Sequence, residues 1–337
     1  MATVERRELR LARPLNTGAG AISARTVFLV RIESDGVVGV GEAAPLPWAG
    51  TETVEQCAAA LQMFVETSVG DGLPPNVLRA VTRGCPAAVH GWEQARADWT
   101  ARRNGVRLAE LWASAPAASV AVNALVDGVA GAVAAVEAGF RTLKLKATSV
   151  DLAAAVRAAV GDVRLRIDAN GAWGDEAEEM LTALAPLGLE YVEQPFLAGS
   201  PEADARRFAE LRGCGVPLAA DESVTGVAAA EVLAPHVDVL VLKPMRLRGF
   251  EGARAIAGIA REQDADVVVT GFLGSAVERA GALHLAAALD SLVPEARRRA
   301  HGLGAGAWLA EDVADLERIE GGRVALSETP GHGVVPR

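Results

Sequence analysis

Residues 142–147 read TLKLKA and place Lys144 and Lys146 two positions apart. Alternate side chains of a β-strand leave the same face, so the two lysines share one face and Leu143 and Leu145 share the other. An exposed edge strand would explain this pattern, because lysines on edge strands discourage aggregation. In a closed barrel, which has no edge, the lysines would instead point inward. The rest of the chain favours the barrel.

Strand-like runs alternate with Ala-rich helical stretches from about residue 119 onwards. The runs are SVAVNALV (119–126), TLKLKA (142–147), VRLRIDAN (163–170), LEYVEQP (189–195), PLAADES (217–223), VDVLVLKP (237–244), DVVVTGF (266–272) and a weaker eighth near RRAHGLGAG (298–306). Strand–helix alternation predicts parallel strands with right-handed crossovers. Eight such units fit a (β/α)8-type barrel. An open doubly wound sheet is the alternative, but no G-x-G-x-x-G follows an early strand.

The first hundred residues do not show this strand–helix alternation. Two runs split by Asp35-Gly36, at 25–34 and 36–46, predict a hairpin, and helical patterns follow at 52–66 and 86–103. This segment is therefore predicted to be α+β. We place the domain boundaries as follows: an α+β domain over 1–105, the barrel over 106–307, and a C-terminal segment over 308–337 that returns to the first domain.

Composition narrows the class of partner. The 337 residues are 50% hydrophobic, enough for a sizeable core, and 33 Lys+Arg against 43 Asp+Glu give a net charge of −10. An acidic chain is a poor partner for nucleic acid. No apolar run reaches membrane-spanning length, and the N-terminus lacks the apolar stretch of a signal peptide. Cys57, Cys85 and Cys214 are far apart and odd in number, which predicts free thiols and a cytoplasmic protein.

Ionisable residues gather at the ends of the predicted strands. These ends open on the same mouth in a parallel barrel, where active sites are built. The residues concerned are Lys144 and Lys146 on the second strand, Asp168 and Asn170 on the third, Glu193 on the fourth, Asp221 and Glu222 on the fifth, and Lys243 on the sixth.

Three of these carboxylates suggest a metal site. Asp168, Glu193 and Asp221 lie one strand–helix unit apart from each other. Crowded carboxylates repel unless a cation balances them, and oxygen ligands suit Mg2+. Any one of these acids alone is better explained as a strand-end cap or an ion-pair partner. Three carboxylates at corresponding strand ends favour a metal site.

The lysines suggest a base. Lys146 precedes the first carboxylate by one unit and Lys243 follows the last by one unit, so they would flank the metal. A lysine beside a cation and a second lysine, here Lys144, has its neutral form favoured. The pattern thus predicts proton abstraction α to a carboxylate of a small substrate, with one base or two.

Five motifs in order resemble the enolase superfamily, specifically its muconate-lactonizing-enzyme subgroup: K-x-K at 144–146, D-x-N at 168–170, E-Q-P at 193–195, D-E-S at 221–223 and K-P at 243–244. The resemblance implies a modified TIM barrel with an N-terminal α+β capping domain. It also implies Lys146 and Lys243 as catalytic residues, Lys144 as an auxiliary, and an enediolate intermediate. Asp168, Glu193 and Asp221 would bind Mg2+, with Mn2+ as a possible substitute, and Asn170 and Glu222 would support these ligands.

Within the subgroup, GEAAPLP (41–47) and HGLGAGAWLAEDV (301–313) resemble the o-succinylbenzoate synthase family of menaquinone biosynthesis. This implies a hydro-lyase that dehydrates 2-succinyl-6-hydroxy-2,4-cyclohexadiene-1-carboxylate to 2-succinylbenzoate. Gly271 and Ser275, after the seventh strand, are the candidates for contacts with the succinyl tail. The loop at 16–24 matches the position of the family's substrate loop, and an ordinary β-connection explains it equally well.

Other activities use the same scaffold. An N-succinylamino acid racemase or another racemase or cycloisomerase of the subgroup would use the same lysines, whereas a dipeptide epimerase would show Asp-x-Asp where this chain has 302–306 without an acid. A Schiff-base aldolase would leave the three carboxylates unexplained. A binding protein with no activity would have lost at least one site residue, and none is lost. Whether the chain is a monomer or a homo-oligomer stays open.

Overall fold

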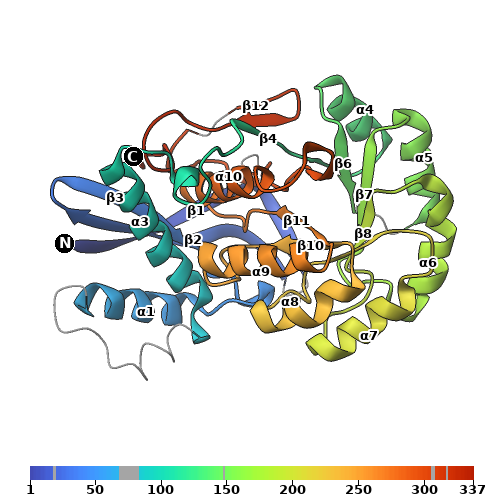
Figure 1. Ribbon diagram of the computed structural model, residues 1–337, viewed down its shortest axis with the longest axis horizontal. Coiled ribbons are helices and arrows are strands. Elements are labelled where there is room, and N and C mark those ends of the chain that lie inside the picture. Colours follow the sequence, from blue (N-terminus) through green and yellow to red (C-terminus); the bar gives the residue numbers. More distant parts are fainter. Residues whose placement is uncertain (18–19, 68–82, 147–148, 305–307, 316–317) are drawn as a thin grey trace.

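The structure is a computed structural model that describes residues 1–17, 20–67, 83–146, 149–304, 308–315 and 318–337. A small α+β unit lies at one end of the molecule and a strand–helix barrel at the other (Figure 1). The predicted fold class, a (β/α)8-type barrel with an N-terminal α+β cap, is confirmed. The predicted domain boundaries at 105 and 307 stay a prediction. Within the described part of the chain, no helix combines the length and apolarity needed to cross a membrane.

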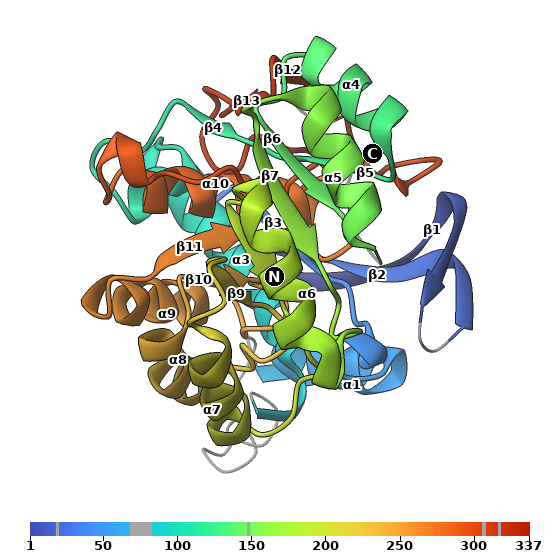
Figure 2. The ribbon, with the colours of Figure 1, turned by 90° about the vertical axis from the view of Figure 1, so that its right-hand side faces the viewer.

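In the described part of the cap, a three-stranded antiparallel sheet packs with two helices. Its strands are β1 (Ala2–Thr17), β2 (Gly20–Ser34) and β3 (Val37–Ala43), and its helices are α1 (Val54–Thr67) and α3 (Pro86–Asn104). Asp35 and Gly36 join β2 to β3 with φ values of 53° and 73°, the left-handed pair that a tight two-residue hairpin needs. β1 and β2 form a long ribbon at one side of the molecule (Figure 2).

Seven parallel strands form the curled sheet of the barrel in simple sequential order. They are β5 (Ala124–Val126), β6 (Thr142–Leu145), β7 (Arg164–Asp168), β8 (Tyr191–Glu193), β9 (Leu218–Ala220), β10 (Val239–Leu242) and β11 (Asp266–Val269). The predicted eighth strand consists of two isolated parallel bridges, from His301 to Val122 and from Gly302 to Thr270. These bridges join the first and last strands and close the ring.

Helices cover the outside of this sheet (Figure 1). They are α4 (Val129–Glu137), α5 (Val150–Val160), α6 (Ala177–Leu184), α7 (Pro201–Leu211), α8 (Val227–Leu233), α9 (Phe250–Glu262) and α10 (Ala276–Asp290). Ser149, Ser200 and Ser275 begin α5, α7 and α10, and each hydroxyl accepts a hydrogen bond from a backbone N–H of the first turn. Short 3-10 turns, η1 (Pro47–Ala49) to η6 (Glu295–Arg297), fill several connections.

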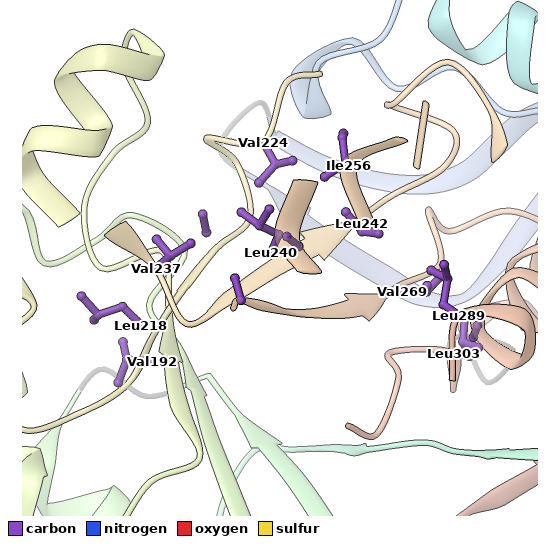
Figure 3. Close-up of a cluster of buried hydrophobic side chains, with 14 of the residues drawn as sticks. Val192, Leu218, Val224, Val237, Leu240, Leu242, Ile256, Val269, Leu289 and Leu303 are labelled. Carbon is purple, nitrogen blue, oxygen red and sulfur yellow. The ribbon is translucent and has the colours of Figure 1, made fainter. Parts of the chain in front are cut away.

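Alternate residues of each strand enter different layers of the core. Val192, Leu218 and Leu240 face the helices in the larger cluster (Figure 3), whereas Tyr191 and Val239 point into the barrel. Parallel strands buried on both faces need such continuous apolar runs. Leu143 and Leu145 also belong to the outer cluster, so the predicted outward orientation of these two leucines is confirmed.

The C-terminal segment contacts both parts of the molecule. The short strands β12 (Ile319–Glu320) and β13 (Arg323–Ala325) form a sheet with β4 (Ser119–Ala121), so the run predicted as one strand over 119–126 is divided between two sheets. Farther along, the backbone N–H of His332 donates to Asp98 of α3 at 2.8 Å.

Candidate active site

The barrel brings the three predicted metal ligands together at its mouth. Asp168 and Glu193 end β7 and β8 and are direct partners across the sheet, and Asp221 follows the last residue of β9. All three side chains are buried, with exposures of 6%, 1% and 4%. Parallel strands in sequential order place their carboxyl ends side by side, which is why these residues meet.

Lys144 lies inside this cluster. Its Nζ is 2.9 Å from Asp168 Oδ2 and 2.7 Å from Glu193 Oε1, because residue 144 points into the barrel. Burial lowers the pKa of Lys144, but Asp168 and Glu193 more than offset this and raise the pKa well above its usual value. Lys144 is therefore held as an ammonium between the two acids.

Lys243 forms the corresponding pair on the other flank. It follows β10, and its Nζ is 2.5 Å from both carboxylate oxygens of Asp221. Burial lowers its pKa, and Asp221 and Glu222 together raise it above the usual value. Lys243 is therefore held as an ammonium, because the negative charge around it exceeds the positive charge.

Lys146 is separated from the ion pairs. It lies one residue beyond β6, and its side chain is exposed, whereas Lys144 is largely buried. The neighbouring Ala147 lies outside the described residues. The two lysines of K-x-K thus have different surroundings, one inside the carboxylate cluster and one open to solvent.

The residues predicted to support the ligands lie beside them. Asn170 has a left-handed φ of 46°, and its backbone N–H donates to Asp168 Oδ1 at 3.0 Å. Burial and then Asp221 raise the pKa of Glu222 to about 7. The Oε2 atom of Glu222 is buried and has no hydrogen-bond partner among the described residues.

Gly271 and Ser275 differ in their exposure to solvent. Gly271 is half-buried after β11, and a side chain there would meet the Glu278 carboxylate at 3.4 Å. Ser275 is fully buried, its N–H donates to Glu42 Oε1 of the cap at 2.8 Å, and its hydroxyl donates to the other oxygen of Glu42. This burial contradicts the predicted contact of Ser275 with substrate: its hydroxyl is engaged at the cap–barrel junction. Of the predicted substrate loop, residues 18–19 lie outside the described residues.

The donor set fits a hard divalent cation. The carboxylates of Asp168, Glu193, Asp221 and Glu222 outnumber the ammonium groups of Lys144 and Lys243. Burial raises the pKa of Glu193 to about 8, and repulsion from Asp168 and Asp221 adds to this against the opposing effect of Lys144. Although the three acids lie on neighbouring strands, no three carboxylate, imidazole or thiol side chains among the described residues are arranged to hold a metal ion. Glu193 and Asp221 instead pair with Lys144 and Lys243. A cation would supply the missing positive charge with oxygen ligands that suit Mg2+.

The chain contains only three lysines, which are Lys144, Lys146 and Lys243. Every other permanently cationic side chain is arginine, which cannot lose its proton in a protein. Lysine is therefore confined to the ends of β6 and β10 at the barrel mouth. Counting lysines separately from arginines would have revealed this signal in the sequence.

Arg246 is a polar neighbour that the motifs did not reveal. Its guanidinium donates to the backbone carbonyl groups of Asp221 and Glu222, at 3.4 and 2.6 Å. Sequence reasoning overlooked Arg246 because one arginine in a loop carries no pattern.

Two family models match this chain. Residues 1–112 match the family model "Mandelate racemase / muconate lactonizing enzyme, N-terminal domain", and residues 128–337 match "Enolase C-terminal domain-like". The chain belongs to the mandelate racemase/muconate lactonizing enzyme family. This family membership confirms the predicted placement in the enolase superfamily and accounts for both the cap and the barrel.

Two curated proteins are similar to this chain in sequence. The o-succinylbenzoate synthase of Mycobacterium ulcerans (strain Agy99) is 40% identical over 189 residues, covering 52% of this chain and 53% of that protein. The o-succinylbenzoate synthase of Mycobacterium tuberculosis (strain ATCC 25618 / H37Rv) is 38% identical over 226 residues, covering 62% and 65%. The chain thus spans between about half and two thirds of the length of these relatives.

A solved structure is similar over nearly the whole chain. The dipeptide epimerase from Methylococcus capsulatus, complexed with Mg and the dipeptide L-Arg-D-Lys, has a TM-score of 0.80 and 27% identity. The similarity covers 99% of this chain and 98% of that one.

Proposed function

We propose that this protein is a Mg2+-dependent o-succinylbenzoate synthase, a hydro-lyase that converts 2-succinyl-6-hydroxy-2,4-cyclohexadiene-1-carboxylate to 2-succinylbenzoate. The observation that carries the proposal is the confinement of lysine to a barrel mouth that also holds three buried carboxylates. The curated relatives named o-succinylbenzoate synthase support the choice of substrate.

Asp168, Glu193 and Asp221 would hold the cation. When bound, it supplies positive charge at the mouth, where the substrate carboxylate becomes more negative during the reaction. The Methylococcus capsulatus epimerase, solved with Mg, supports this choice of ion.

The lysines carry out the proton transfers. Lys146, exposed at the mouth, removes the proton from the ring carbon α to the carboxylate and leaves an enediolate. The Lys243 ammonium stabilises this negative charge from the other flank. Protonated Lys146 then gives its proton to the departing hydroxyl group, so the C–O bond breaks, water leaves and the ring becomes aromatic. One C–H and one C–O bond are lost in total, and no oxidant is needed.

Turnover of the diene tests the proposal directly. Purified protein with Mg2+ should remove the diene absorbance and release a product lighter by one water. Treatment with EDTA should stop the reaction, and added Mg2+ or Mn2+ should restore it. If there is no turnover but N-succinylamino acids exchange their α-hydrogen in D2O, the chain is a racemase instead.

Arginine substitutions distinguish the proton-accepting role proposed for Lys146 from the ion-pairing role of Lys144. Lys146→Arg keeps the charge but cannot accept a proton, and we expect turnover to fall about 10²–10⁴-fold. Lys144→Arg is the matched control, because a guanidinium can still pair with Asp168 and Glu193, and it should retain far more activity. Equal losses in the two variants would show that Lys146 is not the base.

A further inference from the structure

Gln194, the middle residue of E-Q-P, is fully buried between the ends of β8 and β9. Its side-chain Oε1 accepts hydrogen bonds from the backbone N–H groups of Asp221 at 3.1 Å and Ser223 at 3.3 Å. Its Nε2 donates to Phe196 O at 3.0 Å and to Ser223 Oγ at 2.9 Å. Two backbone donors and one backbone acceptor fix the orientation of the amide, so neither a carboxylate nor an apolar side chain could replace it.

The backbone of Gln194 reaches both neighbouring strands. Its N–H donates to Ala219 O of β9 at 2.9 Å, and its carbonyl accepts from Gly171, in the loop after β7, at 2.7 Å. Its φ of 44° lies in the left-handed region, which costs a residue with a side chain about 1 kcal/mol or more. Such strain is retained where the surrounding contacts require the conformation.

The network continues into the outer helices. Ser223 Oγ donates to Asp204 Oδ2 of α7 at 2.7 Å, and Asp204 is itself buried and accepts from the N–H of Gly199. Gln194 is therefore linked through Ser223 to helix α7.

We infer that Gln194 is a positioning residue that fixes the spacing of the carboxylates of Asp168, Glu193 and Asp221. It directly follows Glu193, holds the N–H of Asp221 with its side chain, and holds the loop after Asp168 with its carbonyl. Three ligands on three strands bind a cation tightly only if their separations are set beforehand. Groups that orient metal ligands typically contribute 10–100-fold to metal affinity. The inference rests on the metal site of the proposed function.

Gln94 provides a matched control. It is also fully buried, its Oε1 accepts from the N–H of Glu42 at 3.1 Å, and its Nε2 donates to Val277 O at 2.6 Å. These bonds join the cap to α10 and do not involve the proposed ligands. Gln94→Met and Gln194→Met therefore remove the same group from two buried networks.

The experiment measures binding of Mn2+ to the whole protein by electron paramagnetic resonance, without turnover. We expect Gln194→Met to weaken the Kd about 10–100-fold. Gln94→Met should bind Mn2+ as the wild type does, although both variants should melt at a lower temperature. Wild-type affinity in Gln194→Met, or equal weakening in both variants, would overturn the inference.

Ser223→Ala keeps the inference testable if Gln194→Met does not fold. It removes the acceptor of one Gln194 bond and the link to Asp204, so Mn2+ binding should weaken, though less than with the loss of the amide. Unchanged binding in Ser223→Ala would count against the inference in that case. If the wild-type protein binds no Mn2+, the metal site of the proposed function fails, and the inference fails with it. Binding by the wild type with unchanged binding in the variants overturns only the inference.

Discussion

Arg166 is a large cation that the barrel buries completely. Its Nε is 2.6 Å from Glu190 Oε2, its Nη1 donates to Ala300 O at 2.7 Å, and its guanidinium lies 4.6 Å from the centre of the Tyr191 ring. A buried charge is tolerated only when such partners replace water. Arg166 thus fills the barrel interior below the carboxylates as part of a buried ion pair, although its Nη2 atom has no hydrogen-bond partner among the described residues.

Removing this guanidinium should destabilise the protein strongly. Arg166→Met leaves the buried Glu190 without its shortest ion pair, and we expect the free energy of unfolding to fall by about 3 kcal/mol in urea titrations. Arg164 also faces Glu190, at 3.8 Å, but its side chain is 51% exposed. Arg164→Met should therefore cost less than about 1 kcal/mol. Similar losses in the two variants would mean that burial of the pair contributes nothing.

At the scale of elements, helix α9 of the barrel is capped at its N-terminus by a side chain from the cap domain. It begins after Gly249, which has a φ of 104°, and the carboxylate of Glu93 from α3 accepts from the N–H groups of Phe250 and Glu251, each at 2.9 Å. A Cβ atom on Gly249 would lie 1.4 Å from Glu93 Oε2. The start of α9 therefore needs a glycine.

Alanine substitutions at Gly249, which precedes α9, and at Gly258, which lies inside it, should have opposite effects on stability. Gly249→Ala displaces the Glu93 cap and strains the backbone, which should lower the free energy of unfolding by at least about 2 kcal/mol. Gly258 lies inside the same helix with open space around its Cβ position, so Gly258→Ala should raise stability by about 0.5–1 kcal/mol. Denaturant titration of both variants checks the pair. An unchanged free energy of unfolding in Gly249→Ala would contradict the role of Glu93 as the N-terminal cap of α9.

Glu93 should also make stability depend on pH. Burial raises the pKa of Glu93 to about 7, above its ordinary 4.5. The folded protein then binds a proton that the unfolded chain releases, so this contribution is complete below about pH 4.5 and is lost as the pH rises through about 7. The contribution amounts to up to about 3 kcal/mol. Unfolding titrations at pH 5 and pH 8 should show a smaller difference for Glu93→Gln than for the wild type, and an equal difference would contradict the assignment.

Elements whose partners are close in sequence could be predicted, and those with distant partners could not. The hairpin at Asp35-Gly36 was recognisable because the turn residues and both strands are contiguous. The run 119–126 was predicted as one strand, but β13 pairs with its first half from two hundred residues away. β1 was not predicted, because residues 5–8 read ERRE and place charges on both faces of the strand.

The same reasoning explains the outcome for the site. Strand ends of a parallel barrel meet whatever the side chains are, so the meeting of Asp168, Glu193 and Asp221 could be predicted from spacing. The ion pairs of Lys144 and Lys243 depend on side-chain directions and local charge balance, which spacing does not contain. The burial of Ser275 depends on a carboxylate from the cap, far away in the sequence.

For the whole molecule, the junction between cap and barrel is polar as well as apolar. Arg25 of β2 donates to the carbonyl groups of Ala44 and Pro45 and also reaches Leu273, in the loop after β11. Glu42 of β3 accepts from Ser275 at the start of α10. The loop that follows the seventh strand is therefore fixed by groups from the cap.

Ser275→Ala tests whether this junction is structural. The substitution leaves one oxygen of the buried Glu42 without its donor, which should lower the free energy of unfolding by about 1–3 kcal/mol. The KM for the diene should not change, because the hydroxyl faces the cap. A raised KM at unchanged stability would restore Ser275 as a substrate contact.

The contact between His332 and Asp98 has a consequence for synthesis on the ribosome. Asp98 is fully buried, and one of its two oxygens accepts from a residue translated 234 positions later. At ordinary elongation rates this interval lasts about 10–50 s. Throughout that time the nascent cap carries an acidic group whose final partner does not yet exist. The last buried hydrogen bonds of the cap therefore form only after the whole barrel has been translated.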